Sequence, residues 1–274
     1  MTRLAGVRRR GITVGITSGK GGVGKTSVAV NVAAALAALG YRVGVLDADF
    51  ALGNVDVMLG LTPGAHVGAV LAGDVSVGRV SLEGPGGIRV IPAGSGIRAL
   101  TSLTPDQWVR LGNLIESAAT ELDFLIVDTA PGIGDTVIDL ARLLDRMVVV
   151  TSHEPTAVVD AYAVAKLLTA AAPHREIGVV VNAARDAGEG QTVFRQLDAA
   201  AHRFLKRGLR YDGYVVRDPQ VGESAVDQRL VVTHRPDAPA SRCFRRLALR
   251  LASWLPDAPV TSQEFERMEA PRCA

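Results

Sequence analysis

Short runs of β-branched and aliphatic residues alternate along the chain with longer segments rich in alanine and leucine. Two of the short runs, 124–127 and 147–150, are apolar at every position, which is typical of strands covered on both faces of a sheet. Most of the longer segments reach ten residues or more, which favours helices over strands. The pattern therefore predicts strands that alternate with helices through the whole chain.

The predicted strands are Ile12–Thr17, Val43–Asp47, Ile88–Ile91, Phe124–Asp128, Met147–Thr151, Ile177–Asn182 and Gly213–Val216. The predicted helices are Thr26–Leu39, Pro105–Ala119, Thr136–Leu144, Pro155–Ala171, Gly190–Lys206 and Ala238–Trp254. Right-handed crossovers join such strands into a parallel sheet. The predicted fold class is therefore α/β, a doubly wound, mostly parallel β-sheet flanked by helices. Because ligands bind at the carboxyl ends of the strands, functional residues are expected directly after positions 17, 47, 128, 151, 182 and 216.

The composition changes this picture little. The 274 residues, of which 48% are hydrophobic, can bury a large core and exclude a disordered chain or a disulfide-stapled miniprotein. Proline and glycine are scattered, which favours one domain with a core over 11–255, a basic segment at 1–10 and a flexible tail at 256–274. The net charge of +2 is too small to indicate nucleic-acid binding by bulk electrostatics. Arginine clusters within 8–10 and 242–250 are interpreted as solvated faces.

The cysteines exclude several classes of site. Cys243 and Cys273 are the only two, and no histidine lies near them at metal-ligand spacing. They support neither a disulfide framework nor a zinc or iron–sulfur site. The first residues contain no apolar run of signal-peptide type, and the longest apolar stretch, Val28–Leu39, is too short to span a bilayer. We therefore expect a cytoplasmic location.

A glycine-rich loop follows the first predicted strand. Residues 19–26 satisfy the pattern Gly-x-x-x-x-Gly-Lys-Ser/Thr and lead directly into an alanine-rich helix. The glycines allow backbone N–H groups to surround phosphate oxygens at a helix N-terminus. Lys25 is expected to reach the β- and γ-phosphates of ATP, and the Thr26 hydroxyl to bind Mg²⁺. The predicted contacts to ATP or ADP are Gly19, Lys20, Gly21, Gly22, Val23, Gly24, Lys25, Thr26 and Ser27.

Acidic residues stand at the ends of two other predicted strands. Asp47 and Asp49 are separated by one residue where the second strand ends, and alternate residues of an extended chain share a face. One carboxylate near Mg²⁺ and another near the attacking water suit phosphoanhydride hydrolysis. Asp128 ends the apolar run 124–127. A strand-end aspartate of this kind can hold Mg²⁺, usually through water, so Asp128 is a third candidate.

The glycine-rich loop resembles that of the deviant Walker A ATPases of the MinD/ParA class, which reads Lys-Gly-Gly-x-Gly-Lys-Thr, as residues 20–26 do here. This resemblance implies an ATP-sandwiched homodimer in which Lys20 crosses to the partner's phosphates. It also implies that Lys20, Lys25 and Asp49 are catalytic, with Asp49 orienting or activating the attacking water. Asp47, together with Thr26 and Asp128, would then support the magnesium shell. Slow, partner-stimulated hydrolysis of ATP to ADP and phosphate is the expected activity.

Further segments resemble the FlhG branch of this class, also named YlxH or FleN, which regulates the number and placement of flagella. They are Leu52–Gly60, Ile91–Ile97, Glu154–Ala157, Asp160–Ala163, Val180–Asn182 and Gly188–Phe194. By this resemblance Asn182 reads the adenine edge. Arg217, Asp218 and Pro219 resemble the segment that closes over the base. The likeness extends from about residue 11 to residue 254.

The same resemblance implies an FlhF-like GTPase, a flagellar basal-body protein or a transcriptional regulator as partner. The pattern Asp-Gln-Ala-x-x-Leu-Arg, with which relatives stimulate that GTPase, is not found in this sequence. Relatives also end in a basic amphipathic helix that inserts into the membrane, whereas 256–274 carries three glutamates around one phenylalanine. The amphipathic stripe Phe244, Leu247, Leu251 and Trp254 is interpreted as core packing, with membrane contact as the alternative. Peripheral association with the inner face of the membrane stays open.

Two other functions fit the same residues. A ParA-type chromosome or plasmid partition ATPase would bind DNA through arginine patches on phosphates, without reading sequence. A nucleotide-locked scaffold or transcription-factor antagonist would use the same site without turnover. An iron–sulfur carrier is disfavoured because no Cys-x-x-Cys pair occurs, and a bacterial tyrosine kinase lacks its C-terminal tyrosine cluster.

Lysine is rare in this chain. Of the 30 lysine and arginine residues, only Lys20, Lys25, Lys166 and Lys206 are lysines. A compact ammonium on a flexible stem enters a phosphate cradle that a broad planar guanidinium would crowd. The two lysines of the glycine-rich loop therefore strengthen the prediction of a two-lysine ATP site.

Overall fold

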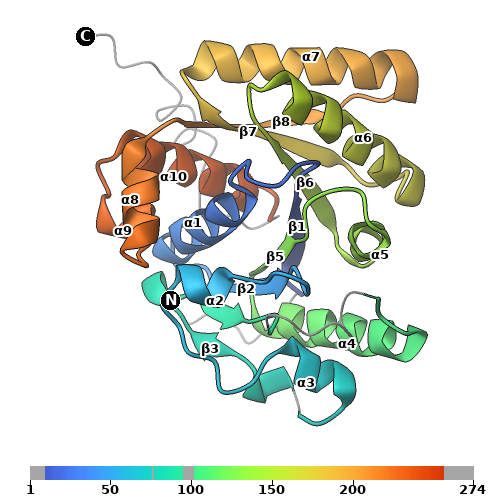
Figure 1. Cartoon of the computed structure of the whole chain (residues 1–274), viewed down its shortest axis with the longest axis vertical. Helices are drawn as coiled ribbons and strands as arrows, with labels where there is room; N and C mark the ends of the chain where they lie inside the picture. The colour runs from blue at the N-terminus through green and yellow to red at the C-terminus, as the bar shows by residue number, and fades with distance from the viewer. Residues whose placement is uncertain (1–9, 76, 95–101, 256–274) are drawn as a thin grey trace, which may run out of the picture.

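The computed structural model describes residues 10–75, 77–94 and 102–255. Among these residues, eight strands form one sheet in the order β3-β4-β2-β5-β1-β6-β7-β8. The pairs of this sheet are parallel except for β3 with β4, which is antiparallel. Helices cover both faces of the sheet (Figure 1). The predicted fold class, a doubly wound and mostly parallel α/β sheet, is confirmed.

The strands are β1 (Ile12–Thr17), β2 (Val43–Ala48), β3 (Leu82–Glu83), β4 (Arg89–Ile91), β5 (Phe124–Thr129), β6 (Arg146–Thr151), β7 (Ile177–Ala184) and β8 (Arg210–Val216). The helices are α1 (Lys25–Ala38), α2 (Val55–Met58), α3 (Val67–Ala72), α4 (Pro105–Glu121), α5 (Asp135–Leu143), α6 (Pro155–Ala171), α7 (Ala187–Leu205), α8 (Pro219–Val226), α9 (Val231–His234) and α10 (Pro239–Ala252). Short 3₁₀ turns are η1 (Val77–Arg79) and η2 (Pro85–Gly87). Every predicted strand and helix has its counterpart here, with ends shifted by up to three residues, as where β8 begins at Arg210 rather than Gly213.

The pleat of the central strands divides their apolar runs between two cores. In β5, Phe124 and Ile126 face the core beneath α1 and α10, whereas Leu125 and Val127 face the core beneath α4, α5, α6 and α7. Both cores are closed to solvent at these positions. A strand that must be apolar on both faces therefore needs the unbroken run seen in the sequence.

Helix α10 settles the role of the amphipathic stripe. Phe244, Leu247 and Leu251 are buried in the core that α10 shares with α1. The Trp254 ring lies within cation–π distance of two guanidiniums, with its centroid 4.8 Å from Arg146 Cζ and 4.3 Å from Arg210 Cζ. The interpretation of this stripe as core packing is confirmed. In the part of the chain that the structure describes, no helix combines the length and the apolar character that crossing a membrane requires.

The predicted basic segment 1–10 is described only from Arg10 onward, and the predicted tail 256–274 and Cys273 lie outside the described residues. Arg10 binds the carboxylates of Glu116 and Asp145. In the second arginine cluster, Arg245 donates to the Pro236 carbonyl oxygen. Some of these arginines therefore bind the protein itself rather than facing only solvent.

Candidate functional site

The glycine-rich loop joins β1, in the middle of the sheet, to α1. Gly22 and Gly24 have left-handed backbones with φ of 80° and 85°, which residues other than glycine rarely adopt. No side chain caps the N-terminus of α1, whose cap residue is Gly24. A Cβ at Gly21 or Gly22 would meet nothing within 4 Å, so the cradle is open. Amides of an uncapped first helical turn are suited to bind an anion.

Lys25, Thr26 and Asp128 converge at the floor of this loop. Lys25 Nζ donates to Asp128 Oδ1 at 2.7 Å, and Thr26 Oγ1 donates to Asp128 Oδ2 at 2.7 Å. The side chains of Lys25 and Asp128 are only 8% and 1% exposed. Burial raises the pKa of the Asp128 carboxyl, while the Lys25 ammonium and the Thr26 hydroxyl act against that rise. The ion pair between Lys25 and Asp128 is therefore shielded from water.

Asp47 lies beside Asp128 because β2 and β5 pair in parallel register at these two residues. Its Oδ1 accepts the N–H of Asp49 at 3.1 Å, and its Oδ2 accepts the N–H of Val55 at 3.1 Å. Burial raises the pKa of the Asp47 carboxyl to about 7, with a further contribution from the charge of Asp128. Asp47 thus binds both ends of the loop that carries Asp49.

Asp49 lies at the start of that loop and is partly exposed. Its Oδ1 accepts the N–H of Leu52 at 3.1 Å, within the loop that follows β2. Its charge also acts on Asp128 and raises the pKa of that carboxyl. The two predicted acidic sites therefore belong to one electrostatic cluster at the carboxyl edge of the sheet.

The side chain of Lys20 points toward α6, whereas that of Lys25 points toward Asp128. Lys20 Nζ donates to Glu154 Oε2 at 2.7 Å and to Thr156 Oγ1 at 3.4 Å. Both partners lie at the start of α6, the helix that follows β6. Because β1 pairs with β6, the sheet order places this helix start next to the glycine-rich loop.

Asn182 lies on the other side of the loop. Its Nδ2 donates to the carbonyl oxygen of Val23 at 2.7 Å, and a Cβ at Gly24 would lie 2.2 Å from the same nitrogen. Nearby, a cavity of about 370 Å³ is lined by His153, Ala183, Arg185, Glu189 and Arg217. A cavity of this volume, at the carboxyl ends of β6, β7 and β8, can accept a small ligand.

The segment after β8 is held in place by its own backbone and side chains. The N–H of Arg217 donates to the Ala184 carbonyl oxygen at 2.7 Å. Asp218 caps α8 through the N–H of Gln220 and accepts the N–H of Ala240 at the start of α10. Pro219 is the first residue of α8. Arg217 therefore lines the cavity beside Asn182, whereas Asp218 and Pro219 shape the chain behind it.

Comparison with known proteins identifies the lineage of this site. The family model described as "ParA: NUBPL iron-transfer P-loop NTPase" matches residues 10–92 and 101–252. The chain belongs to the ParA family of P-loop NTPases. The antiactivator FleN of Pseudomonas aeruginosa is 42% identical over 253 residues, which cover 92% of this chain and 90% of that protein. The flagellum site-determining protein YlxH of Helicobacter pylori is 30% identical over 247 residues, covering 88% and 82%.

A solved structure supports the fold of this ParA-family chain. The septum site-determining protein MinD of Pyrococcus horikoshii, complexed with Mg-ADP, superposes with a TM-score of 0.74. The identity is 21%, and the match covers 86% of this chain and 94% of that one. The resemblance to MinD/ParA ATPases and to the FleN and YlxH branch is thus confirmed, as is the fold.

A P-loop NTPase of this family implies a nucleotide and Mg²⁺, and the residues of the site fit both. The open cradle at Gly21 and Gly22 leaves room for phosphate oxygens. Thr26 and Asp128 supply a hydroxyl and a carboxylate next to each other, which suits an ion that keeps most of its ligands as water. Within residues 10–75, 77–94 and 102–255, no three His, Cys, Asp or Glu side chains are grouped to hold a metal.

The sequence did not single out Glu154 and Thr156 as ligands of Lys20, nor His153, Arg185 and Glu189 as lining of the cavity. The signal that could have found His153 and Glu154 is their place directly after a predicted strand end at position 151. Arg185 and Glu189 follow β7 in the same way. The position directly after a strand end therefore identifies site residues that the motifs do not name.

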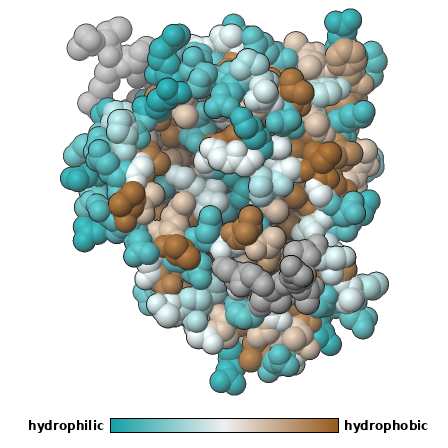
Figure 2. All heavy atoms as spheres, in the orientation of Figure 1, coloured by the Kyte–Doolittle hydropathy of each residue, from teal (hydrophilic) through white to brown (hydrophobic). Residues whose placement is uncertain are grey.

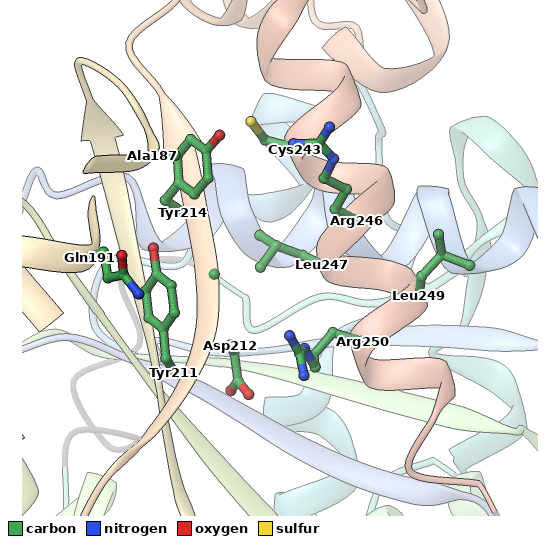
Figure 3. Close-up of a pocket in the computed structure, with 11 residues that line it drawn as sticks. Ala187, Gln191, Tyr211, Asp212, Tyr214, Cys243, Arg246, Leu247, Leu249 and Arg250 are labelled. Carbon is green, nitrogen blue, oxygen red and sulfur yellow. The ribbon is translucent and has the colours of Figure 1, made fainter. Parts of the chain in front are cut away.

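A second cavity of about 360 Å³ lies away from the glycine-rich loop, between α7, β8 and α10 (Figure 3). Gln191, Tyr211, Asp212, Cys243 and Arg246 line part of it. None of its lining residues is among the predicted site residues. It is therefore not a candidate for the nucleotide site.

Proposed function

We propose that this protein is an ATP-dependent switch that binds Mg-ATP, dimerises around it and hydrolyses it slowly. The observation that carries the proposal is the convergence of Lys25, Thr26 and Asp128 beneath an uncapped helix N-terminus. That arrangement supplies backbone donors, one ammonium, one hydroxyl and one carboxylate around the open cradle at Gly21 and Gly22.

Phosphate binding would rearrange the floor of the site. Lys25 would exchange the Asp128 carboxylate for β- and γ-phosphate oxygens, because an ammonium near two anionic ligands favours the more highly charged one. When bound, Mg²⁺ neutralises charge on the phosphates. Thr26 and Asp128, already in contact, would hold it, and Asp47 would keep the neighbouring loop in register through Asp49 and Val55.

Asp49 and Lys20 would act where the γ-phosphate leaves. Asp49 would orient the attacking water from the loop that Asp47 anchors. Lys20 would reach the phosphates of a second copy and so make the dimer depend on ATP. A ligand shifts an equilibrium only through contacts that differ between two states, and a lysine in trans is such a contact.

The similarity to FleN and YlxH supports a role in the number or placement of flagella. A cytoplasmic location, with contact to the inner face of the membrane as an option, is part of this proposal. The partner would be an FlhF-like GTPase, a basal-body protein or a transcriptional regulator. The antiactivator description of FleN favours the transcriptional regulator among these three.

The test of dimerisation uses light scattering behind a sizing column. We expect a dimer of the wild type with Mg-ATP and a monomer with ADP. Lys20→Ala and Lys25→Ala should remain monomeric with Mg-ATP at the same protein concentration. Wild-type dimerisation by either variant would contradict the roles assigned to the two lysines.

The test of hydrolysis uses phosphate release by Asp49→Ala. This variant should still dimerise with Mg-ATP, and its turnover should fall by about 100-fold or more, as for the loss of a group that positions the nucleophile. Undiminished turnover would remove Asp49 from the mechanism.

Filter binding of DNA with and without ATP separates the proposed switch from the partition alternative. A partition ATPase requires ATP-dependent, salt-sensitive retention of DNA.

A further inference from the structure

The two lysines of the glycine-rich loop are both occupied in the single chain, but in different surroundings. Lys25 binds Asp128 in the buried floor, with side chains 8% and 1% exposed. Lys20 binds Glu154 at the surface, where the two side chains are 41% and 54% exposed. The first pair belongs to the phosphate site. The second pair binds Lys20 to its own chain.

The backbone on the amino side of Lys20 packs against α6 and against the loop after β5. An added Cβ at Gly19 would lie 2.3 Å from the carbonyl carbon and oxygen of Asp160, which means that the loop backbone touches the second turn of α6. The Ser18 carbonyl oxygen accepts the N–H of Gly132 at 2.7 Å. With the backbone held on two sides, the side chain of Lys20 is the part that can move.

We propose that Glu154 is a latch that holds Lys20 in cis and must release it before the lysine can cross to a second copy of this chain. This inference rests on the proposed function, in which Lys20 contacts the partner's phosphates. Thr156 assists by accepting a second hydrogen bond from the same nitrogen. Glu154 is thus a positioning residue that acts through Lys20 and opposes dimerisation.

The electrostatic surroundings of Glu154 favour this role. The Lys20 hydrogen bond lowers the pKa of the Glu154 carboxyl, and the charges of His153 and Arg217 act in the same direction. Glu154 therefore stays ionised near neutral pH and can attract Lys20 back when ATP leaves. Its exposure keeps the pair weak, and a latch that opens on nucleotide binding has to be weak.

The symmetry of a dimer increases the effect of a weak latch. Removal of a single exposed lysine–carboxylate pair changes an equilibrium by about 1.4- to 5-fold. A two-fold symmetric dimer releases one Lys20 from each protomer, so the change enters the dimer dissociation constant twice. We therefore expect a total change of about 2- to 25-fold, which a concentration series can resolve.

The experiment compares wild type with Glu154→Gln in Mg²⁺ and a non-hydrolysable ATP analogue, by sedimentation velocity over a range of protein concentrations. Glu154→Gln keeps the size of the side chain and removes its charge. We expect its dimer dissociation constant to be about 2- to 25-fold lower than that of the wild type. The matched control is Glu121→Gln, because Glu121 is a similarly exposed glutamate that pairs with Arg89 far from the site.

A second readout tests the latch without a dimer. Acetic anhydride at low dose, followed by mass spectrometry, measures acylation of each of the four lysines in the nucleotide-free chain. Reaction at Lys20 must break its bond to Glu154, so Glu154→Gln should raise Lys20 acylation several-fold relative to Lys166 and Lys206. These two lysines lie on α6 and at the end of α7 and act as internal references.

The outcomes separate the two proposals. A wild type that stays monomeric with the analogue overturns the proposed switch, and the latch with it. A wild type that dimerises while Glu154→Gln dimerises equally or less, or leaves Lys20 acylation unchanged, overturns only the latch. Tighter dimerisation of Glu154→Gln, with Glu121→Gln equal to wild type and faster acylation of Lys20, supports it.

Discussion

Asp145 shows at the scale of one residue how the first strand is fixed in the sheet. Its Oδ2 accepts the N–H and the hydroxyl of Thr13 at 2.9 and 2.8 Å, and Arg10 Nη1 donates to it at 2.6 Å. Burial by itself would raise the pKa of this carboxyl, but the hydrogen bonds from Thr13 and Arg10 outweigh burial and lower it. The ionised form is therefore the one that the folded chain favours.

This depressed pKa makes a prediction about pH. A carboxyl whose pKa is lower in the folded than in the unfolded chain contributes stability above its unfolded pKa, and that contribution is lost as pH falls through the folded pKa. Asp145→Asn should therefore lower the urea midpoint at pH 7 and differ less from wild type near pH 3. The control Asp139→Asn removes a half-buried partner of the exposed Arg142 on α5 and should show little change at either pH. An equal loss for Asp145→Asn at both pH values would contradict the linkage.

The residues of the site were predictable to different degrees. Lys25, Thr26 and Asp128 follow from motif spacing and strand ends, because a phosphate cradle needs those groups in a fixed local order. The Lys20–Glu154 contact spans 134 positions of sequence. It depends on β6 lying next to β1, and strand order is not encoded in local spacing. Contacts set by sheet order are the part that sequence patterns leave open.

At the scale of elements, the pairing of β7 with β8 depends on glycine, which has no side chain, at position 178. The register is irregular around Asp212, whose neighbours Tyr211 and Gly213 pair with consecutive residues of β7. The Asp212 carboxylate is fully buried and bound by Arg210. A Cβ at Gly178 would lie 1.8 Å from Asp212 Oδ2. Glycine at 178 therefore makes room for the buried Asp212 carboxylate, which pairs with the partly exposed Arg210.

Two glycine-to-alanine substitutions should change the free energy of unfolding in opposite directions. Gly178→Ala should destabilise the fold by about 2–4 kcal/mol, because the methyl group must displace a packed and paired carboxylate. Gly112→Ala lies inside α4, where the nearest atom to an added Cβ is 3.8 Å away, and should stabilise by about 0.5–1 kcal/mol. Urea unfolding followed by circular dichroism measures both. A neutral Gly178→Ala would show that Asp212 relaxes freely.

Element length explains which parts of the fold were predictable. Strands such as β5 and helices such as α6 repeat their apolar pattern often enough to be recognised. β3 has two residues, and α2 and α9 have four each. Segments this short contain only about one period of a strand or helix pattern, and packing against neighbours fixes them instead. They were accordingly absent from the sequence prediction.

At the scale of the whole molecule, the two apolar cores lie on opposite faces of one sheet. Figure 2 shows apolar side chains scattered over the visible face among polar ones, without one continuous apolar belt. The core beneath α1 and α10 contains Phe244, which is 1% exposed, whereas Phe204 at the end of α7 is 62% exposed. The same residue type therefore contributes differently according to its layer.

This contrast makes a prediction for the fold as a unit. Phe244→Ala should cost about 3–5 kcal/mol, since a buried aromatic leaves a cavity between α1, α10 and the sheet. Phe204→Ala should change stability by well under that amount, about 0.5 kcal/mol or less in the manner of surface substitutions. Both values come from the same urea titrations. Equal losses at the two positions would mean that α10 does not pack on the sheet as described.

The position of Trp254 makes it an intrinsic fluorescence probe at the amino ends of β6 and β8. Trp254 and Trp108 are the only two tryptophans in the chain, so Trp108→Phe leaves a single emitter. That emitter lies against the first residues of β6 and β8, at the edge opposite the glycine-rich loop. Indole emission responds to nearby charge and water, and the two guanidiniums define its surroundings in the single chain. Its wavelength would therefore report, without any added dye, whether events at the nucleotide edge are felt along the full length of the strands.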